Sequence, residues 1–440
     1  MENETFALLM AGGFLGLLFV GVPVATSLLI SGFVFGYLGF GSFLFDLLPA
    51  RFFGVVTNYT LMAAPLFVFM GVMLEKSRLA EDLLDIAGHM FGRLPGGMGV
   101  SVIVVGVLMG ASTGIVGATV VTLGLLTLPV FLRRNYNKAL SCGIICSSGT
   151  LGQIIPPSLV LILLADILSV SVGTIFAAAM IPGLVLSAIY IAFVLCIGAF
   201  RPDWAPPIPS KERDAMTKSK LLKEFFRVVV PVIGLILAVL GSIIGGVAAP
   251  TEAASMGSLG ALLIVAISGR LDKEALIGTL DQTLKITAMI FFILISSQVF
   301  SLSFRGLGGD HLVASLFELI PGGVTADLVF MLLLVFVLGF FLEWIEISYI
   351  VLPLFVPIFA NAGVDMVWLA MLISMTLQTT FLSPPVGWSL FFLKGVAPPE
   401  VTTRDIYLGA MPFLILQVIA VVMIFNFPDI ALWLPRYLGW

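Results

Sequence analysis

Long apolar runs, separated by short polar stretches, follow one another along almost the whole chain. A helix needs about 20 apolar residues to cross the hydrocarbon core of a bilayer, and these runs reach that length repeatedly. The runs occupy, in order, residues of about 6–44, 50–75, 98–132, 138–168, 172–200, 228–268, 278–304, 324–360, 366–396 and 406–427. Strand-like alternation over about ten positions is absent, so a transmembrane barrel is not expected. The pattern predicts an all-α polytopic membrane protein.

The composition agrees with a bilayer environment. Of the 440 residues, 60% are hydrophobic and 10% are charged, and the mean hydropathy is +1.17. These values lie outside the range of soluble globular domains, so we expect the lipid bilayer to surround the chain and expect no nucleic acid partner. The N-terminal residues MENETFALLM contain no basic residue, and no small-residue cleavage site follows them. We therefore expect no removable signal peptide.

The chain offers few groups for metal or catalytic chemistry. Cys142, Cys146 and Cys196 fall in apolar segments, where packing is the expected role of a cysteine. His89 and His311 are the only histidines, which is too few for a transition-metal centre. No nucleophile with a base, and no phosphate-binding G-x-x-x-x-G-K-[ST] sequence, stands out. We expect no enzyme, no cofactor and no direct use of ATP.

The second half of the chain repeats landmarks of the first half in the same order. Four landmarks recur at a nearly constant offset of 226 to 228 positions: Pro23 and Pro250, LPGG at 94–97 and IPGG at 320–323, Pro129 and Pro357, and Pro156-Pro157 and Pro384-Pro385. The stretch 201–227 is the only long polar segment and is the predicted cytoplasmic linker. We therefore predict a first repeat over 1–200 and a second over 228–440.

The basic residues suggest how the repeats thread the membrane, because cytoplasmic loops collect Lys and Arg. If the linker is cytoplasmic and the segments at 98–132 and 324–360 are hairpins that return to their own side, only Arg51, Arg305 and Arg436 of the 21 basic residues fall outside. Each half then crosses five times, so the halves are inverted and both termini are periplasmic. This is the inverted-repeat plan of secondary transporters. The amphipathic stretch 75–94 is predicted to lie along the cytoplasmic surface.

Two apolar segments are interrupted by adjacent prolines, and we predict a discontinuous helix in each. These segments are about 138–168 and 366–396. Irregular backbone at membrane depth is tolerated only where protein, water or a ligand satisfies it. Glycines and small hydroxyl residues surround the prolines: Ser147, Ser148, Gly149, Thr150 and Gly152 in one segment, and Thr379, Thr380, Ser383 and Gly387 in the other. Hydroxyl and carbonyl oxygens suit an alkali cation, and we expect sodium; the alternative is that the prolines kink the helices for packing.

A predicted hairpin precedes each discontinuous helix. The first has the uncharged, small-residue stretch GASTGIVGAT at 110–119, which suits a bent tip. The second has FFLEWIEISYIVLP at 340–353, where Glu343 and Glu346 are acids within an apolar segment. Such residues are costly at membrane depth and are functional candidates. The alternative is that they lie near the interface or bond to backbone donors.

Four stretches resemble the large membrane subunit of the tripartite ATP-independent periplasmic (TRAP) transporters. They are GASTGIVGATVVTLGLLTLPVFLRRNYNKAL at 110–140, GTLGQIIPPSLVLIL at 149–163, GGVAAPTEAASMG at 245–257 and FLSPPVGWSLF at 381–391. The resemblance covers nearly the whole chain and implies an elevator-type, sodium-driven importer of organic anions in the inner membrane of a bacterium or archaeon. It also implies two partners, a small Q-type membrane subunit of about four helices and an extracytoplasmic substrate-binding protein.

The resemblance implies two sodium sites with the substrate between the hairpin tips. One sodium site is expected at Ser112, Thr113, Gly114, Gly149, Gly152 and Pro156. The other is expected at Glu343, Thr379, Thr380 and Pro384. The residues expected to contact substrate are Ser112, Thr150, Ser158, Glu346 and Ser383.

The second hairpin departs from the family pattern. An acidic residue followed by Thr-Pro is usual there, and EWIEIS stands at 343–348 instead. This leaves the ligands of the second sodium site open. Within the family, the hairpin resembles those of systems for 2-oxo or hydroxy carboxylates, which implies such a substrate. Three other classes of protein are weighed against the TRAP subunit: a self-sufficient sodium/carboxylate transporter, an intramembrane enzyme and a channel.

Overall fold

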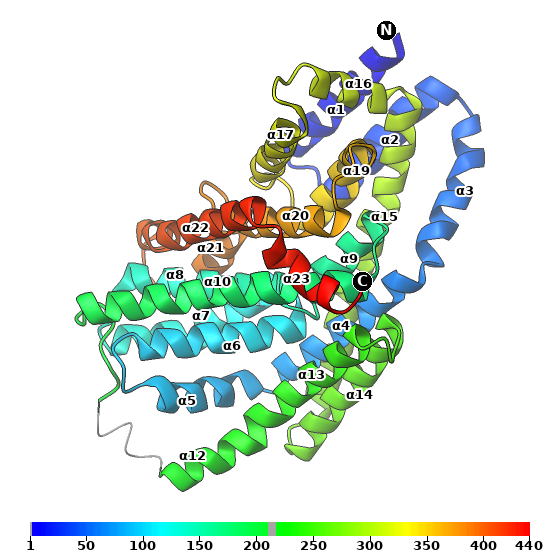
Figure 1. The fold of residues 1–440 in the computed structure, drawn as a ribbon. Helices are drawn as coiled ribbons and strands as arrows, with labels where there is room; N and C mark the ends of the chain where they lie inside the picture. The colour runs from blue at the N-terminus through cyan, green and yellow to red at the C-terminus, as the bar shows by residue number, and fades with distance from the viewer. Residues whose placement is uncertain (1, 210–216) are drawn as a thin grey trace.

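In a computed structural model of the chain, residues 2–209 and 217–440 are described, and every regular element within them is a helix (Figure 1). The elements of the first half are α1 (Glu2–Phe19), α2 (Val24–Phe40), α3 (Phe43–Val56), α4 (Tyr59–Lys76), α5 (Leu79–Phe91), α6 (Gly97–Thr113), α7 (Val116–Arg133), α8 (Lys138–Thr150), the 3-10 turn η1 (Leu151–Gln153), α9 (Leu159–Ile167) and α10 (Val172–Phe200). Among the described residues, eight helices are long and apolar enough to cross a membrane.

The second half has the same kinds of element. They are α12 (Lys218–Glu224), the π-helical turn η2 (Phe225–Val229), α13 (Val230–Ile244), α14 (Pro250–Ile267), α15 (Lys273–Gly306), α16 (Gly309–Glu318), α17 (Gly323–Leu338), α18 (Trp344–Glu346), the π-helical turn η3 (Ile347–Val351), α19 (Leu352–Asn361), α20 (Met366–Thr380), α21 (Trp388–Val396), α22 (Thr403–Asn426) and α23 (Asp429–Tyr437).

The two halves repeat one another element by element. In the first half, the helix pair α6 and α7 precedes an interrupted helix made of α8, η1 and α9. In the second half, α17 is followed by α18, η3 and α19, and then by the interrupted helix made of α20 and α21. The predicted all-α fold, with a bent helix pair and a discontinuous helix in each half, is confirmed.

Three boundaries differ from the prediction. The polar linker expected over 201–227 is shorter, because α12 begins at Lys218 and runs through η2 into α13 as one long helix with a charged end. The run at 6–44, which was expected to cross twice, holds α1 and α2, but a further helix, α3, spans the end of that run and the start of the run at 50–75.

The helix α16 was not expected at all. It lies about 228 positions after the predicted surface helix, now seen as α5, and it meets α17 at an angle of 120°. It is therefore the counterpart of α5 in the second repeat. It has only ten residues, of mixed polarity, so no apolar run marks it in the sequence.

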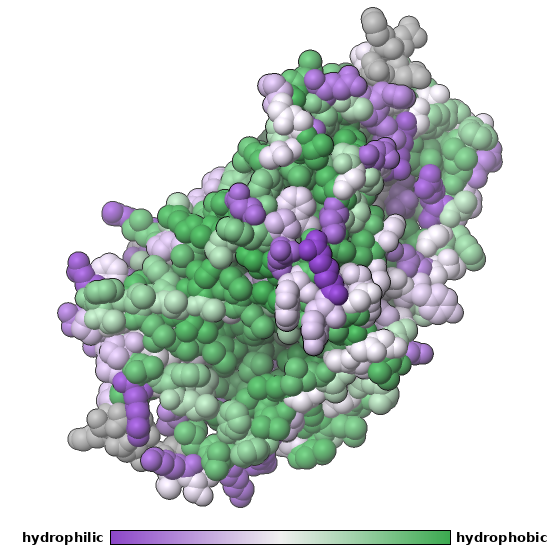
Figure 2. All heavy atoms as spheres, in the orientation of Figure 1, coloured by the Kyte–Doolittle hydropathy of each residue, from purple (hydrophilic) through white to green (hydrophobic). Residues whose placement is uncertain are grey.

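The outside of the molecule is apolar. Figure 2 shows hydrophobic residues over most of the visible face, with hydrophilic residues gathered mainly near the upper and lower ends and over the C-terminal helix. Leu237, Leu263 and Ile415 are each more than half exposed, although a soluble protein would bury side chains of this kind. This arrangement is what a lipid-facing surface requires.

Inside, helices approach closely where glycines replace larger residues. A Cβ atom on Gly143 of α8 would collide with the backbone of Gly409 in α22, and one on Gly106 of α6 would lie 2.7 Å from Cβ of Ser148. Small residues at helix contacts are the usual means of packing helices in a membrane. Both contacts involve α8, so they hold the first half of the interrupted helix firmly in place.

Candidate functional site

The first interruption begins after Thr150. The chain makes the η1 turn, passes through Pro156 and Pro157, and resumes as a helix at Leu159. Ser158 Oγ donates a hydrogen bond to the carbonyl oxygen of Gln153 at 2.6 Å, which closes the loop. The carbonyl oxygens that accept no hydrogen bond from the described residues are those of Gly152, Ile154, Ile155, Pro156 and Pro157. Buried carbonyls without partners are candidate cation ligands.

The second interruption has the same character. It begins after Thr380 and ends at Trp388, with Gly387 at a φ of 41°. The backbone N–H and Oγ of Ser389 both donate to the carbonyl oxygen of Phe381, at 3.2 and 2.7 Å. The carbonyl oxygens of Leu382, Ser383 and Pro384 accept no hydrogen bond from the part of the chain that the structure describes.

The hydroxyl groups at both interruptions donate back to the helix that carries them. Thr150 Oγ1 donates to Ser147 O at 2.9 Å, and Thr380 Oγ1 donates to Leu377 O at 2.7 Å. Thr379 and Ser383 do the same, to Thr376 O at 2.6 Å and Thr379 O at 2.7 Å. Since each donor hydrogen is used, the lone pairs of these oxygens remain available to a cation.

Each interruption lies directly against the preceding helix pair. A Cβ atom on Gly152 would overlap the backbone of Gly110 at the end of α6, and a Cβ on Gly339 would overlap the side chain of Thr380. Gly152 and Thr380 are 228 positions apart, so the same contact occurs in both repeats. Gly149, expected in unwound chain, instead lies within α8 and makes room for Val120.

The tip of the first helix pair is at Gly114. This residue has a φ of 62° and ends α6, and a Cβ atom there would lie 3.1 Å from the backbone nitrogen of Leu159. The tip therefore meets the resumption of the interrupted helix. The side chains of Ser112 and Thr113, predicted at the first sodium site, lie outside the described residues.

The second helix pair has its tip at residues 339–345, from the end of α17 to the start of α18. A cavity of about 470 Å³ lies between the two tips. Its residues come from the first tip, the start of α9, the second tip, the second interruption and the helices α4, α15 and α21. They are Glu75, Gly114, Ile115, Val116, Gly117, Ala118, Val121, Leu159, Gln282, Ile286, Met289, Ile290, Glu343, Trp344, Ile345, Phe381 and Phe392. The size is that of a small-molecule site.

The two acidic residues of the second tip lie in different surroundings. Glu343, expected at a sodium site, lines the cavity. Glu346, expected to contact substrate, is buried, and its Oε2 accepts a hydrogen bond from the backbone N–H of Glu343 at 2.7 Å. Glu346 therefore caps the first turn of the resumed helix, which was the alternative considered for an acid at this position.

Sequence reasoning missed Glu75, which lines the same cavity. Thr122 Oγ1 of α7 donates to Oε1 of Glu75 at 3.2 Å, and Oε2 is buried without a hydrogen-bond partner among the described residues. The predicted substrate residues Thr150, Ser158 and Ser383 do not line the cavity. A signal for Glu75 exists in the sequence, since it is the one acid in α4, but its place beside Lys76 led to the prediction that it begins the surface helix.

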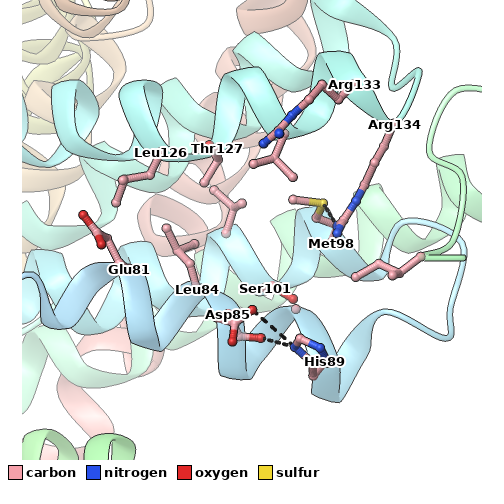
Figure 3. Close-up of a pocket in the computed structure, with 14 residues that line it drawn as sticks. Glu81, Leu84, Asp85, His89, Met98, Ser101, Leu126, Thr127, Arg133 and Arg134 are labelled. Atoms are coloured by element: carbon pink, nitrogen blue, oxygen red, sulfur yellow. Dashed lines mark hydrogen bonds and ion pairs between the residues drawn. The ribbon is translucent and has the colours of Figure 1, made fainter. Parts of the chain in front are cut away.

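A second cavity of about 470 Å³ lies between α5, α6 and α7 (Figure 3). Met98 and Ser101 at the start of α6 and Arg133 at the end of α7 border it, so it lies at the base of the helix pair, away from the tip. Beside it, Nδ1 of His89 lies 3.4 Å from Oδ1 of Asp85, one turn earlier on α5. Its distance from both interruptions makes it the weaker candidate.

The fold and the site define a polytopic membrane transporter built from two repeats around a central cavity. Residues 11–430 match the family model described as "Tripartite ATP-independent periplasmic transporter, DctM component". The chain belongs to this family, which confirms the resemblance of its four motifs.

Individual relatives agree. The chain is 28% identical to the C4-dicarboxylate TRAP transporter large permease protein DctM of Pseudomonas aeruginosa, over 89% of this chain and 90% of that protein. It is 27% identical to the sialic acid TRAP transporter large permease protein SiaM of Vibrio cholerae, over 97% and 98%. The crystal structure of the Alcanivorax borkumensis YdaH transporter has a similar fold, with a TM-score of 0.61 and 15% identity over 99% of this chain and 98% of that one.

Proposed function

We propose that this chain is the large subunit of a sodium-coupled importer of a carboxylate across the cytoplasmic membrane. The observation that carries the proposal is the cavity between the two tips, flanked by two interruptions that leave carbonyl oxygens without hydrogen-bond partners. A small membrane subunit and an extracytoplasmic binding protein complete the system, and the binding protein delivers the substrate. The repeats are inverted, and both termini are periplasmic.

We assign one sodium ion to each interruption. The first site uses the backbone of the tip at Ser112–Gly114 together with the carbonyls of Gly152 and Pro156. The second uses the hydroxyl oxygens of Thr379 and Thr380 and the carbonyl of Pro384. Oxygen-only ligands suit a hard alkali cation. We assign Glu343 to the lining of the substrate cavity instead of to the sodium site.

The transport step is an elevator movement. The mobile unit consists of α6–α10 and α17–α22, which hold both tips and both interruptions, and α10 and α22 belong to it because they pack closely on α6, α8 and α20. The scaffold includes α4, which contacts the mobile unit through polar pairs near both of its ends: Asn58 with Asp166, and Glu75 with Thr122. Such polar contacts exchange more readily than interlocked apolar packing, which suits a surface that slides.

The test is uptake by liposomes that contain this chain with its two partner proteins. A binding screen on the extracytoplasmic protein first names the cargo. Uptake of that cargo should require an inward sodium gradient, and Thr380→Ala or Ser112→Ala should raise the sodium concentration for half-maximal uptake severalfold. Thr57→Ala is the matched control, because the Thr57 hydroxyl also donates to its own helix, to Phe53 O at 2.7 Å, but is exposed and does not line the cavity.

Two results would contradict the proposal. Uptake that depends on neither the sodium gradient nor the side chain of Thr380 would show that the assignment of the sodium sites is wrong. Uptake at the full rate without the binding protein would instead identify a self-sufficient sodium/carboxylate transporter.

A further inference from the structure

The lining of the central cavity limits the chemistry of its cargo. We propose that the carboxylate carried by this chain also bears a positively charged group, so that the substrate is a zwitterion. This inference rests on the proposed function and narrows its substrate class. Three observations on the cavity carry it: two carboxylates, three aromatic rings and two helix N-termini.

One carboxylate comes from the scaffold and the other from the mobile unit. Glu75 belongs to the scaffold helix α4, whereas Glu343 belongs to the second tip. Among the described residues that line the cavity, none is Lys, Arg or His. Lys76 follows Glu75 in sequence, but it is exposed and lines a different, surface cavity with Arg78.

A purely anionic cargo would therefore meet two negative side chains and no cationic one. Oε2 of Glu75 is buried without a hydrogen-bond partner among the described residues, which is costly unless a ligand supplies a donor or a positive charge. A cationic group in the cavity would supply Oε2 of Glu75 with the missing partner and would lie in a cavity that Glu343 also lines.

Aromatic rings complete the surroundings of a cation. Trp344, Phe381 and Phe392 line the same cavity as the two carboxylates. The faces of aromatic rings attract ammonium groups, and recognition of alkylated ammonium ligands commonly combines several rings. An apolar cargo would also use these rings, but it would leave the carboxylates unpaired.

Two helix N-termini provide a site for the carboxylate end of the cargo. The cavity includes Val116, Gly117 and Ala118 at the start of α7, and Leu159 at the start of α9. The backbone N–H groups of Gly117 and Ala118 donate no hydrogen bond within the described part of the chain. Unpaired N–H groups at the positive end of a helix favour a carboxylate. The cavity thus offers an anion site and a cation site within about 470 Å³.

Matched pairs of probes test the charge directly. Glycine betaine and 3,3-dimethylbutanoate have the same shape, as have proline and cyclopentanecarboxylate, and each pair differs in a positive nitrogen. Binding is measured as thermal stabilisation of the purified complex of this chain with its small subunit, in sodium buffer, with succinate as a dianionic reference. The zwitterion of at least one pair should stabilise the complex more than its purely anionic partner, which lacks the positive nitrogen, and more than succinate.

Variants locate the effect. Glu75→Gln and Glu343→Gln should each weaken the apparent affinity for the zwitterion about tenfold while leaving the sodium dependence of uptake unchanged. Glu274→Gln, an exposed acid at the start of α15, should leave both unchanged. If the Gln variants alter the sodium requirement instead, the carboxylates are sodium ligands and the inference is wrong.

The remaining outcomes are also decisive. The absence of any preference for the zwitterionic member of a pair overturns the inference, and so does a cargo without a positive group in the screen of the binding protein. Sodium-driven uptake of succinate would overturn it while leaving the proposed function intact. If uptake of every probe were independent of sodium, the proposed function itself would be wrong.

Discussion

Asn58 Nδ2 donates a hydrogen bond to Oδ1 of Asp166 at 2.6 Å, and this bond joins the start of α4 to the end of α9. The side-chain oxygen of the same asparagine accepts from the backbone N–H groups of Thr60 and Leu61, so it also caps α4. Tyr349 of η3 donates to the other oxygen of Asp166 at 3.3 Å. One carboxylate therefore connects elements from both repeats with the scaffold.

A double-mutant cycle tests this connection. Asn58→Ser keeps a capping oxygen but removes the amide donor, and Asp166→Ala removes the acceptor. We expect each variant to lower the thermal stability of the purified complex, with a coupling energy of about 0.5–3 kcal/mol between the two positions. Strictly additive losses, measured by thermal unfolding in detergent, would show that the bond contributes nothing of its own.

The contact between Gly110 and Gly152 leaves no room for a side chain. A Cβ atom on Gly152 would meet backbone atoms of Gly110, which cannot rotate away as a side chain would. We expect Gly152→Ala to destabilise the chain by about 1–3 kcal/mol, as measured by thermal unfolding. Gly234→Ala is the matched control, because no atom lies within 4 Å of a Cβ there, and it should be neutral or slightly stabilising. Equal stability of the two variants would contradict the close approach.

The interruption at Pro156-Pro157 should be necessary for sodium coupling. Alanines at both positions restore two backbone donors, and a helix that continues through this region would pair the carbonyls now left free. We expect normal expression but no sodium-dependent uptake in liposomes. Pro49→Ala, which removes a proline inside the exposed helix α3, should transport normally. Transport at the wild-type rate by the double alanine variant would show that these prolines serve only the packing of the helix.

Much of the fold follows from local sequence alone. Apolar runs of spanning length predicted the helices, because no other element except a barrel pairs its backbone groups in a bilayer. The adjacent prolines located both interruptions within a few residues, because proline acts on the backbone immediately around it. The error at Gly149 has the same origin, since a glycine permits unwinding but does not require it, and here it accommodates Val120.

The composition of the cavity could not be predicted in this way. Glu75 and Glu343 are 268 positions apart in sequence and face one cavity only because α4 packs beside both repeats. Glu343 and Glu346 are equivalent candidates in sequence. Only the structure distinguishes them, because the bend of the second tip lets the Glu346 carboxylate accept from the backbone N–H of Glu343. Neither relationship has a local signature.

The sequence by itself determined the class of molecule, the repeat and the positions of the two breaks, because hydropathy and proline act over short stretches of chain. Only the tertiary structure decided which acids face the central cavity and which breaks and tips come together. Those relationships depend on how distant helices pack, and packing is set by the shapes of many side chains at once.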